Sequence, residues 1–216
     1  MKFFIDTANL QQIKQAQAMG IIDGVTTNPS LMAKEGIKGK DNILAHYKEI
    51  CDSVNGDVSA EVLSTDYAGM VREAEELMEI DPKIVVKVPV TADGIRAIKH
   101  MYDNGIRSNC TLIFSAGQAL LAAKAGATYV SPFIGRLDDI TADGLGLIED
   151  IRHIFDNYQF TTSILAASIR HPMHIINCAR IGADVVTSPL ESIAALLHHP
   201  LTDSGLAKFV EDSKKM

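Results

Sequence analysis

Eight short β-branched runs alternate with segments of helical periodicity along the whole chain, and this alternation limits the possible folds more than any other feature. Strands separated by helices form parallel sheets, because each helix returns the chain to the start of the next strand. The expected strands are Lys2–Asp6, Gly24–Asn28, Val58–Leu63, Ile84–Val88, Ser108–Phe114, Thr128–Phe133, Ser163–Ala167 and Asp184–Thr187. Eight such units predict a closed (β/α)8 TIM barrel, a fold of typically about 250 residues and at least about 200.

The length of 216 residues is enough for one barrel with little decoration and too small for two enzymatic domains. No linker rich in Pro, Gly or Ser divides the chain, so residues 1–216 are predicted to form a single α/β domain. A doubly wound open sheet is the alternative fold. It typically has a glycine-rich turn after its first strand, and Asp6–Asn9 contains no glycine.

Cap residues mark several expected helix boundaries. Asn28 precedes Pro29 and Ser188 precedes Pro189, which predicts two helices that begin at a proline after an N-cap side chain. Residues 204–216 extend beyond the eighth unit, and Ser204–Lys214 predicts an amphipathic helix. Such a helix needs a surface to cover, on its own barrel or on a neighbour's.

Composition excludes several classes of protein. Apolar residues make up 47% and charged residues 22% of the chain, unlike disordered, collagen-like or coiled-coil proteins. With 20 basic and 27 acidic residues the net charge is −7, which argues against nucleic-acid or anionic-membrane binding, because both need a positive face. No signal-type or bilayer-spanning stretch is found, so a cytoplasmic protein is predicted. Cys51, Cys110 and Cys178 are predicted to be free thiols of the core.

Polar residues gather at the predicted carboxyl ends of the strands, where TIM barrels carry their active sites. These residues are Asp6, Asn28, Glu61, Lys87, Asn109, Thr111, Ser131 and Ser168. Lys87 is the most informative, because its strand neighbours are apolar and the strand is covered on both sides. A lysine kept from water can be held neutral and condense with a ketone or aldehyde, and the resulting Schiff base is an electron sink for carbon–carbon cleavage. Alternatively, Lys87 reaches water at the strand end or pairs with an acid.

Two carboxylates, Asp6 and Glu61, are expected at the same barrel mouth, and carbonyl chemistry needs groups that take and return protons. Either could instead be a structural partner of Lys87. Asn109 and Thr111 alternate on one strand and could hold a water between acid and imine, or make only local hydrogen bonds.

Arg136, Ser168 and Arg170 follow the sixth and seventh strands, near the place where barrels often bind phosphate. Two guanidiniums and a hydroxyl could form a phosphate clamp. Alternatively, Arg136 pairs with Asp138 or Asp139 at the surface. The histidines and cysteines lack metal-type spacing, so no metal site is predicted.

Six motifs together carry a resemblance to a known family. They are Ile5–Ala8, Gly24–Ser30, Val85–Pro89, Asn109–Leu112, Tyr129–Arg136 and Ala166–Arg170. In this order and spacing they resemble the transaldolases, especially the small single-barrel subfamily, and the similarity spans the whole chain. One departure is Ile169, which stands where the larger transaldolases usually have Phe.

The resemblance implies roles for the matching residues. Lys87 resembles the Schiff-base lysine, and Asp6 resembles the acid/base that handles the hydroxyl next to the cleaved bond. Glu61 and Thr111 resemble the pair that positions the catalytic water. The implied reaction moves a dihydroxyacetone unit from sedoheptulose 7-phosphate or fructose 6-phosphate to erythrose 4-phosphate or glyceraldehyde 3-phosphate, in the non-oxidative pentose phosphate pathway. The resemblance implies neither a metal nor an organic cofactor.

The same resemblance implies how substrates are held. The residues that match the dihydroxyacetone-binding set are Asn28, Asn109 and Ser131, and those that match the phosphate-binding set are Arg136, Ser168 and Arg170. The resemblance to the small subfamily also implies a ring-shaped homo-oligomer, a decamer or a pentamer, in which the C-terminal helix packs on the next subunit. Residues 204–216 are expected to do the same here.

Two other functions compete with a transaldolase. The first is a fructose 6-phosphate aldolase. This branch resembles the chain in its small barrel and its lysine, but it releases free dihydroxyacetone and has Gln and Tyr at the positions of Glu61 and Phe133. Both positions are transaldolase-like here. The other is a non-catalytic sugar-phosphate-binding barrel, for which a desolvated Lys87 would have no use.

Overall fold

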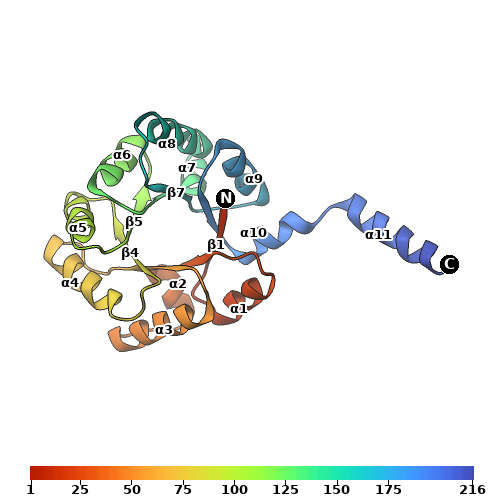
Figure 1. Cartoon of the computed structure of the whole chain (residues 1–216), viewed down its shortest axis with the longest axis horizontal. Coiled ribbons are helices and arrows are strands. Elements are labelled where there is room, and N and C mark those ends of the chain that lie inside the picture. The colour runs from red at the N-terminus through yellow and green to blue at the C-terminus, as the bar shows by residue number, and fades with distance from the viewer.

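The computed structural model describes residues 1–216, and in it eight parallel strands close into a ring surrounded by helices (Figure 1). The strands are β1 Lys2–Asp6, β2 Gly24–Thr26, β3 Asp57–Glu61, β4 Ile84–Pro89, β5 Ser108–Ile113, β6 Tyr129–Pro132, β7 Ser163–Ala166 and β8 Val185–Ser188. The α-helices are α1 Leu10–Ala18, α2 Pro29–Lys34, α3 Lys40–Ser53, α4 Tyr67–Met78, α5 Ala92–Asp103, α6 Ala116–Ala125, α7 Ile134–Asp138, α8 Gly144–Tyr158, α9 Pro172–Ile181, α10 Leu190–Ala194 and α11 Pro200–Ser213. A short 3-10 helix, η1, spans Ala195–Leu197.

The predicted (β/α)8 TIM barrel is confirmed. β1 pairs with β2 on one side and with β8 on the other, so that Ile5 lies opposite both Val25 and Ser188. Each strand ends within two residues of its predicted position. The prediction that Ser188 caps a helix is wrong, because pairing with β1 keeps Ser188 in the strand and α10 starts only at Leu190.

The inside of the barrel has an apolar lower layer and a polar upper layer. Side chains two residues apart on one strand point to the same side, so each inward apolar residue is followed two positions later by an inward residue nearer the carboxyl end. The pairs are Phe4 and Asp6, Val85 and Lys87, Tyr129 and Ser131, and Val185 and Thr187. Gly24 makes room for the lower layer, since a Cβ there would lie 2.6 Å from the Phe4 ring. The lower layer therefore fills the barrel and forms a floor beneath the polar residues.

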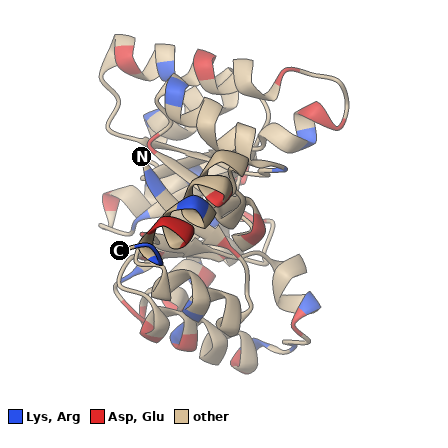
Figure 2. Ribbon diagram, turned by 90° about the vertical axis from the view of Figure 1, so that its right-hand side faces the viewer, with Lys and Arg blue, Asp and Glu red and all other residues tan.

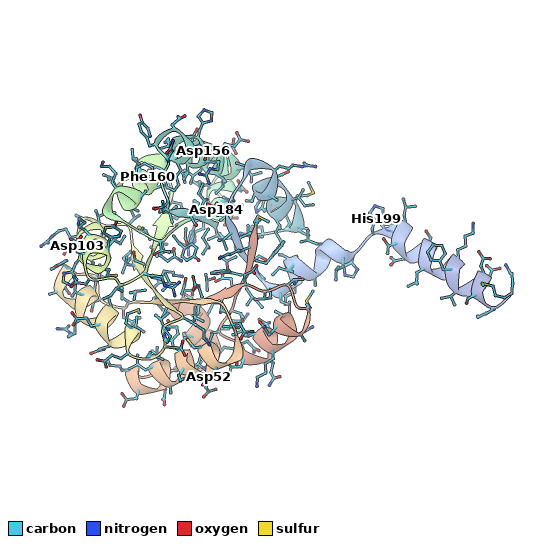
Figure 3. The ribbon with its side chains drawn as sticks, viewed as in Figure 1. Asp52, Asp103, Asp156, Phe160, Asp184 and His199 are labelled. Carbon is cyan, nitrogen blue, oxygen red and sulfur yellow. The ribbon has the colours of Figure 1, made fainter.

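A larger core lies between the strands and the surrounding helices, and all three cysteines belong to it as free, buried thiols, as predicted. On the outside, Lys and Arg are interspersed with Asp and Glu (Figure 2). Asp52, Asp103 and Asp156 lie on the rim of the ring (Figure 3), each paired with a cation one helical turn earlier on its own helix. No helix is both long enough and apolar enough to cross a membrane.

The C-terminal helix α11 extends away from the barrel (Figure 1). It begins at Pro200, four residues before the predicted start, because the ring of His199 accepts a hydrogen bond from the Leu201 N–H and proline takes the first helical position. His199 marks the point at which the chain enters this helix (Figure 3). None of the residues of α11 is buried, and Phe209 is 73% exposed.

Candidate active site

Two adjoining cavities, of about 250 and 400 Å³, open at the carboxyl ends of the strands. Ten of the eleven predicted site residues line one or both of them: Asp6, Asn28, Glu61, Lys87, Thr111, Ser131, Phe133, Arg136, Ser168 and Arg170. The eleventh, Asn109, is completely buried and lies outside the lining. The structure therefore brings residues from seven strands and the turns after them to one mouth.

Lys87 lies near the end of β4 and is only 5% exposed. Its Nζ donates a hydrogen bond to the main-chain oxygen of Thr27 at 2.7 Å and lies 3.1 Å from Oε2 of Glu61. The expectation that an acid pairs with Lys87 is met by Glu61, while both residues still line the mouth cavity. The amine is thus held at a fixed point between two oxygens, with the cavity in front of it.

Asp6 ends β1 beside Lys87 and accepts a hydrogen bond from the hydroxyl of Thr26 at 2.7 Å. That hydroxyl also lies 2.6 Å from the hydroxyl of Thr187 on β8, so the three oxygens form a chain across the mouth. Burial raises the pKa of the Asp6 carboxyl, and the charge of Lys87 and the Thr26 hydrogen bond only partly oppose the rise. A carboxyl group with a raised pKa is suited to giving a proton as well as to taking one.

Thr111 reaches the cavity from an irregular stretch of β5. The register between β5 and β6 shifts between Cys110 and Ile113, and Leu112 has a φ of +61°, in the left-handed region. A non-glycine residue there costs of the order of 1–3 kcal/mol, and such strain gathers at functional sites. The bulge changes the direction of the strand directly after Thr111, whose side chain lines both cavities.

Asn109 supports the site from below. Its amide donates to the Ser59 hydroxyl at 3.1 Å, and its amide oxygen accepts from the Ser131 hydroxyl at 2.8 Å. Ser131 therefore lines the cavity, while Asn109 fixes the Ser131 hydroxyl from behind. Asn28 is the predicted N-cap of α2, since its side-chain oxygen accepts from the Leu31 N–H at 3.0 Å. Its amide nitrogen remains for the cavity.

Arg136 does not form the alternative surface ion pair. Neither Asp138 nor Asp139 bonds to it, and its guanidinium carbon lies 5.0 Å from the centre of the Phe133 ring. Stacking on an aromatic face orients a guanidinium without neutralising its charge. Arg136 is therefore a free cation at the cavity rim.

Arg170 is the arginine that pairs with Asp139, at 2.6 Å. Gly135 lets it lie close to α7, because a Cβ at Gly135 would lie 2.7 Å from Cγ of Arg170. The main-chain N–H of Arg170 donates to the buried ring of His174 at 3.3 Å, and burial above all lowers the His174 pKa, which keeps the ring neutral and able to accept. Ser168 precedes Arg170 with a φ of +61°, a second strained residue at this mouth.

Sequence reasoning missed the supporting residues of the site. Thr26 and Thr187 extend the Asp6 hydrogen bond, and the main-chain oxygen of Thr27 holds Lys87. The inward position of Thr187, two residues after Val185, could have signalled its place in the upper layer. No group of three or more His, Cys, Asp or Glu side chains is arranged to hold a metal ion.

A closed (β/α)8 barrel with a buried lysine, two acids and two arginines at the carboxyl ends of its strands has the architecture of a lysine-centred barrel enzyme. Residues 3–216 match the sequence profile of the family described as Transaldolase/Fructose-6-phosphate aldolase. The chain belongs to this family, as the six motifs predict.

Several relatives are similar over their full lengths. A protein of Cytophaga hutchinsonii is 70% identical over 216 residues, which cover 100% of this chain and 99% of that protein. Proteins of Porphyromonas gingivalis and Bacteroides thetaiotaomicron are each 66% identical over 216 residues, covering 100% of this chain and 98% and 99% of their own lengths. All three carry the name "Probable transaldolase".

Proposed function

We propose that this protein is a transaldolase that transfers a dihydroxyacetone unit from sedoheptulose 7-phosphate or fructose 6-phosphate to erythrose 4-phosphate or glyceraldehyde 3-phosphate. The observation that carries the proposal is the position of Lys87, whose amine is buried, faces the mouth cavity and lies 3.1 Å from the Glu61 carboxylate. A nucleophilic lysine, an acid/base beside it and cations for a phosphate are what a Schiff-base reaction on a sugar phosphate needs. The names of the relatives favour a transaldolase.

Lys87 is the nucleophile in this mechanism. Its amine attacks the ketone carbon of the donor, water leaves, and the protonated imine remains. Asp6 then takes the proton of the hydroxyl beside the bond to be cleaved, the carbon–carbon bond breaks, and the electron pair moves to the imine nitrogen to give an enamine. The raised pKa of Asp6 suits it to return this proton when the enamine attacks the acceptor aldehyde. Glu61 and Thr111 orient the water that is lost and later returns.

The remaining mouth residues bind the substrate. Asn28 and Ser131 hold the hydroxyls of the three-carbon unit, with Asn109 fixing the Ser131 hydroxyl rather than contacting the sugar. Arg136, Ser168 and Arg170, which follow β6 and β7, hold the phosphate. The mechanism calls for no metal and no organic cofactor.

The fate of the enamine separates a transaldolase from an aldolase. This chain has Glu61 and Phe133 at the two positions where the resembling aldolases have Gln and Tyr. The Phe133 ring lies against the Arg136 guanidinium and 5.8 Å from the Phe114 ring, and it lines the cavity without a phenol hydroxyl. The missing phenol hydroxyl removes one proton donor from this position, which favours retention of the enamine until an acceptor arrives.

The test is the release of glyceraldehyde 3-phosphate from fructose 6-phosphate by the purified protein, with and without erythrose 4-phosphate. Sustained release only with the acceptor is the result expected of a transaldolase. Equal release without the acceptor would make the protein an aldolase, and no release under either condition would favour a non-catalytic barrel.

We infer further that α11 packs on a second copy of this chain in a homo-oligomer, a decamer or a pentamer. Leu206, Phe209 and Val210 are 62%, 73% and 49% exposed on a helix that its own barrel leaves uncovered. Light scattering is expected to give an oligomeric mass that Leu206→Ser with Phe209→Ser lowers. A monomeric mass for the unaltered protein would rule this assembly out.

A place in the cytoplasm, in the non-oxidative pentose phosphate pathway, fits these substrates. Three buried thiols, none of them in a disulfide, suit a reducing compartment.

A further inference from the structure

The hydrogen-bond ladder between β2 and β3 stops beside the catalytic lysine. The Thr27 N–H still donates to the Ser59 oxygen at 3.4 Å. In a regular parallel ladder the next hydrogen bond would run from the Glu61 N–H to the Thr27 oxygen. That oxygen instead accepts from Nζ of Lys87 at 2.7 Å. The ladder is therefore broken in favour of a hydrogen bond to the lysine.

The residues after Thr27 prevent the ladder from continuing. In a regular ladder the N–H of residue 29 would donate to the main-chain oxygen of Glu61. Pro29 has no N–H, so this hydrogen bond cannot form. Asn28 turns the chain into α2 by capping its first turn. The break between β2 and β3 is thus fixed by the sequence Thr27–Pro29 and leaves the Glu61 N–H without a strand partner.

Tyr47 of α3 supplies the missing acceptor. Its hydroxyl accepts the Glu61 N–H at 3.1 Å, and the side chain is 2% exposed. A buried N–H group without a partner is unfavourable, so an acceptor at this point is needed if the Thr27 oxygen is to bond elsewhere. Burial raises the pKa of the phenol, which keeps Tyr47 neutral beside the carboxylate of Glu61.

We propose that Tyr47 is a positioning residue of the reaction: by accepting the Glu61 N–H it leaves the Thr27 oxygen free to hold Lys87. The inference rests on the proposed role of Lys87 as the Schiff-base nucleophile. Without the phenol oxygen, the Glu61 N–H competes with Nζ for the Thr27 oxygen. The lysine then loses its fixed position relative to the substrate, and Glu61 shifts with its main chain.

The test compares two tyrosines that differ in their place in the barrel. Tyr47→Phe removes the acceptor at the carboxyl end. Tyr129→Phe is the matched control, because Tyr129 is also buried and its hydroxyl also makes one hydrogen bond, to Asp57 at 2.8 Å at the amino end. Each variant is assayed for kcat and KM with fructose 6-phosphate and erythrose 4-phosphate, for the single-turnover rate at which borohydride traps the dihydroxyacetone adduct, and for its melting temperature.

Tyr47→Phe is expected to lower kcat and the trapping rate about tenfold, the factor that corresponds to one ordinary hydrogen bond, with little change in KM. Tyr129→Phe is expected to keep both rates near those of the unaltered protein, while both variants melt at a lower temperature. The inference is overturned if Tyr47→Phe only melts earlier and traps the adduct at the unaltered rate. If the unaltered protein forms no adduct, the proposed function fails, and the role of Tyr47 fails with it.

Discussion

At the amino ends of the strands, Asp57 accepts hydrogen bonds from Arg107 at 2.7 Å and from Tyr129 at 2.8 Å. At the carboxyl ends, Lys87 and Glu61 form a pair of similar chemistry, supported by a second buried tyrosine. The amino-end groups are bound to one another beneath the apolar layer. The carboxyl-end groups face a cavity.

The two ends also differ in where the backbone adopts positive φ angles. Leu112 and Ser168, two of the four non-glycine residues with positive φ, lie at the carboxyl ends of β5 and β7. On the amino-end side, Gln159 has a positive φ as the C-cap of helix α8. Strain persists where the surrounding structure enforces it, and it gathers where side chains must be aimed. The amino end thus holds its groups in contact with one another, and the carboxyl end presents the same kinds of side chain to the cavity where we propose that the chemistry takes place.

The largest expected difference between the two ends comes from removing one cation at each. Lys87→Met replaces the proposed nucleophile with an apolar side chain of similar volume, and turnover should fall by a factor of the order of 10⁴ or more. Circular dichroism should remain native. Arg107→Met removes the cation of the amino-end pair and should lower the free energy of unfolding by roughly 1 kcal/mol, because the pair is partly exposed. Its turnover should stay near that of the unaltered protein.

Those two variants also decide whether Lys87 takes part in the chemistry at all. Borohydride reduction with fructose 6-phosphate should add a three-carbon unit to the unaltered protein and to Arg107→Met, and leave Lys87→Met unmodified. Sustained turnover by Lys87→Met would remove Lys87 from the mechanism.

The next largest effect is expected at the proposed phosphate site. Arg136→Ala removes a guanidinium that makes no ion pair with the protein, so the change should act on substrate binding more than on folding. A hydrogen bond to a charged group contributes about 1.5–3 kcal/mol, so KM for fructose 6-phosphate should rise roughly 10- to 100-fold. Free dihydroxyacetone has no phosphate and serves as the control, since its borohydride trapping should be unchanged. An equal loss with both compounds would place Arg136 outside the phosphate site.

A smaller, qualitative shift is expected from the two positions that distinguish the aldolases. Glu61→Gln with Phe133→Tyr places an amide beside Lys87 and a phenol hydroxyl at position 133, which supplies a proton donor for the enamine. The ratio of free dihydroxyacetone released to transfer product should rise severalfold. The measurement is the yield of both products at a fixed acceptor concentration. An unchanged ratio means that specificity lies at other residues.

The sequence allowed the barrel and most of its mouth to be predicted, because both follow from local patterns. A period of two along a strand fixes which residues face inward, and apolar neighbours mark Lys87 as buried. The strand ends were harder to predict. β2 stops at Thr26 rather than at Asn28, because the Thr27 oxygen bonds to a lysine 60 residues away and Asn28 becomes a helix cap.

The supporting contacts could not be predicted, because they join residues that are far apart in the chain and carry no local signal. Thr26 and Thr187 meet across 161 residues, and the partner of Asp139 is Arg170 rather than the nearer Arg136. Ser188 has the local signature of a helix cap, but pairing with β1 overrides that signature. Local preference is decisive only where no tertiary contact competes with it.

The smallest expected effect is a change in melting temperature when a carboxylate is replaced by an amide. The change has opposite signs at the two ends of the barrel and depends on pH. Burial raises the pKa of the Asp6 carboxyl in the folded protein above its ordinary value of 3.8. The ionised carboxylate therefore destabilises the fold, by nothing below pH 3.8 and by an amount that grows as pH rises through the folded-state pKa. Asp6→Asn buries no ionised carboxylate and should melt above the unaltered protein at neutral pH. The difference in melting temperature should shrink as pH falls toward 3.8. Asp57→Asn, which breaks the amino-end pair, should melt below it at neutral pH. Thermal melts of the three proteins across this range test both signs, and a lower melting temperature for Asp6→Asn at neutral pH would mean that Lys87 stabilises the Asp6 carboxylate more than burial destabilises it.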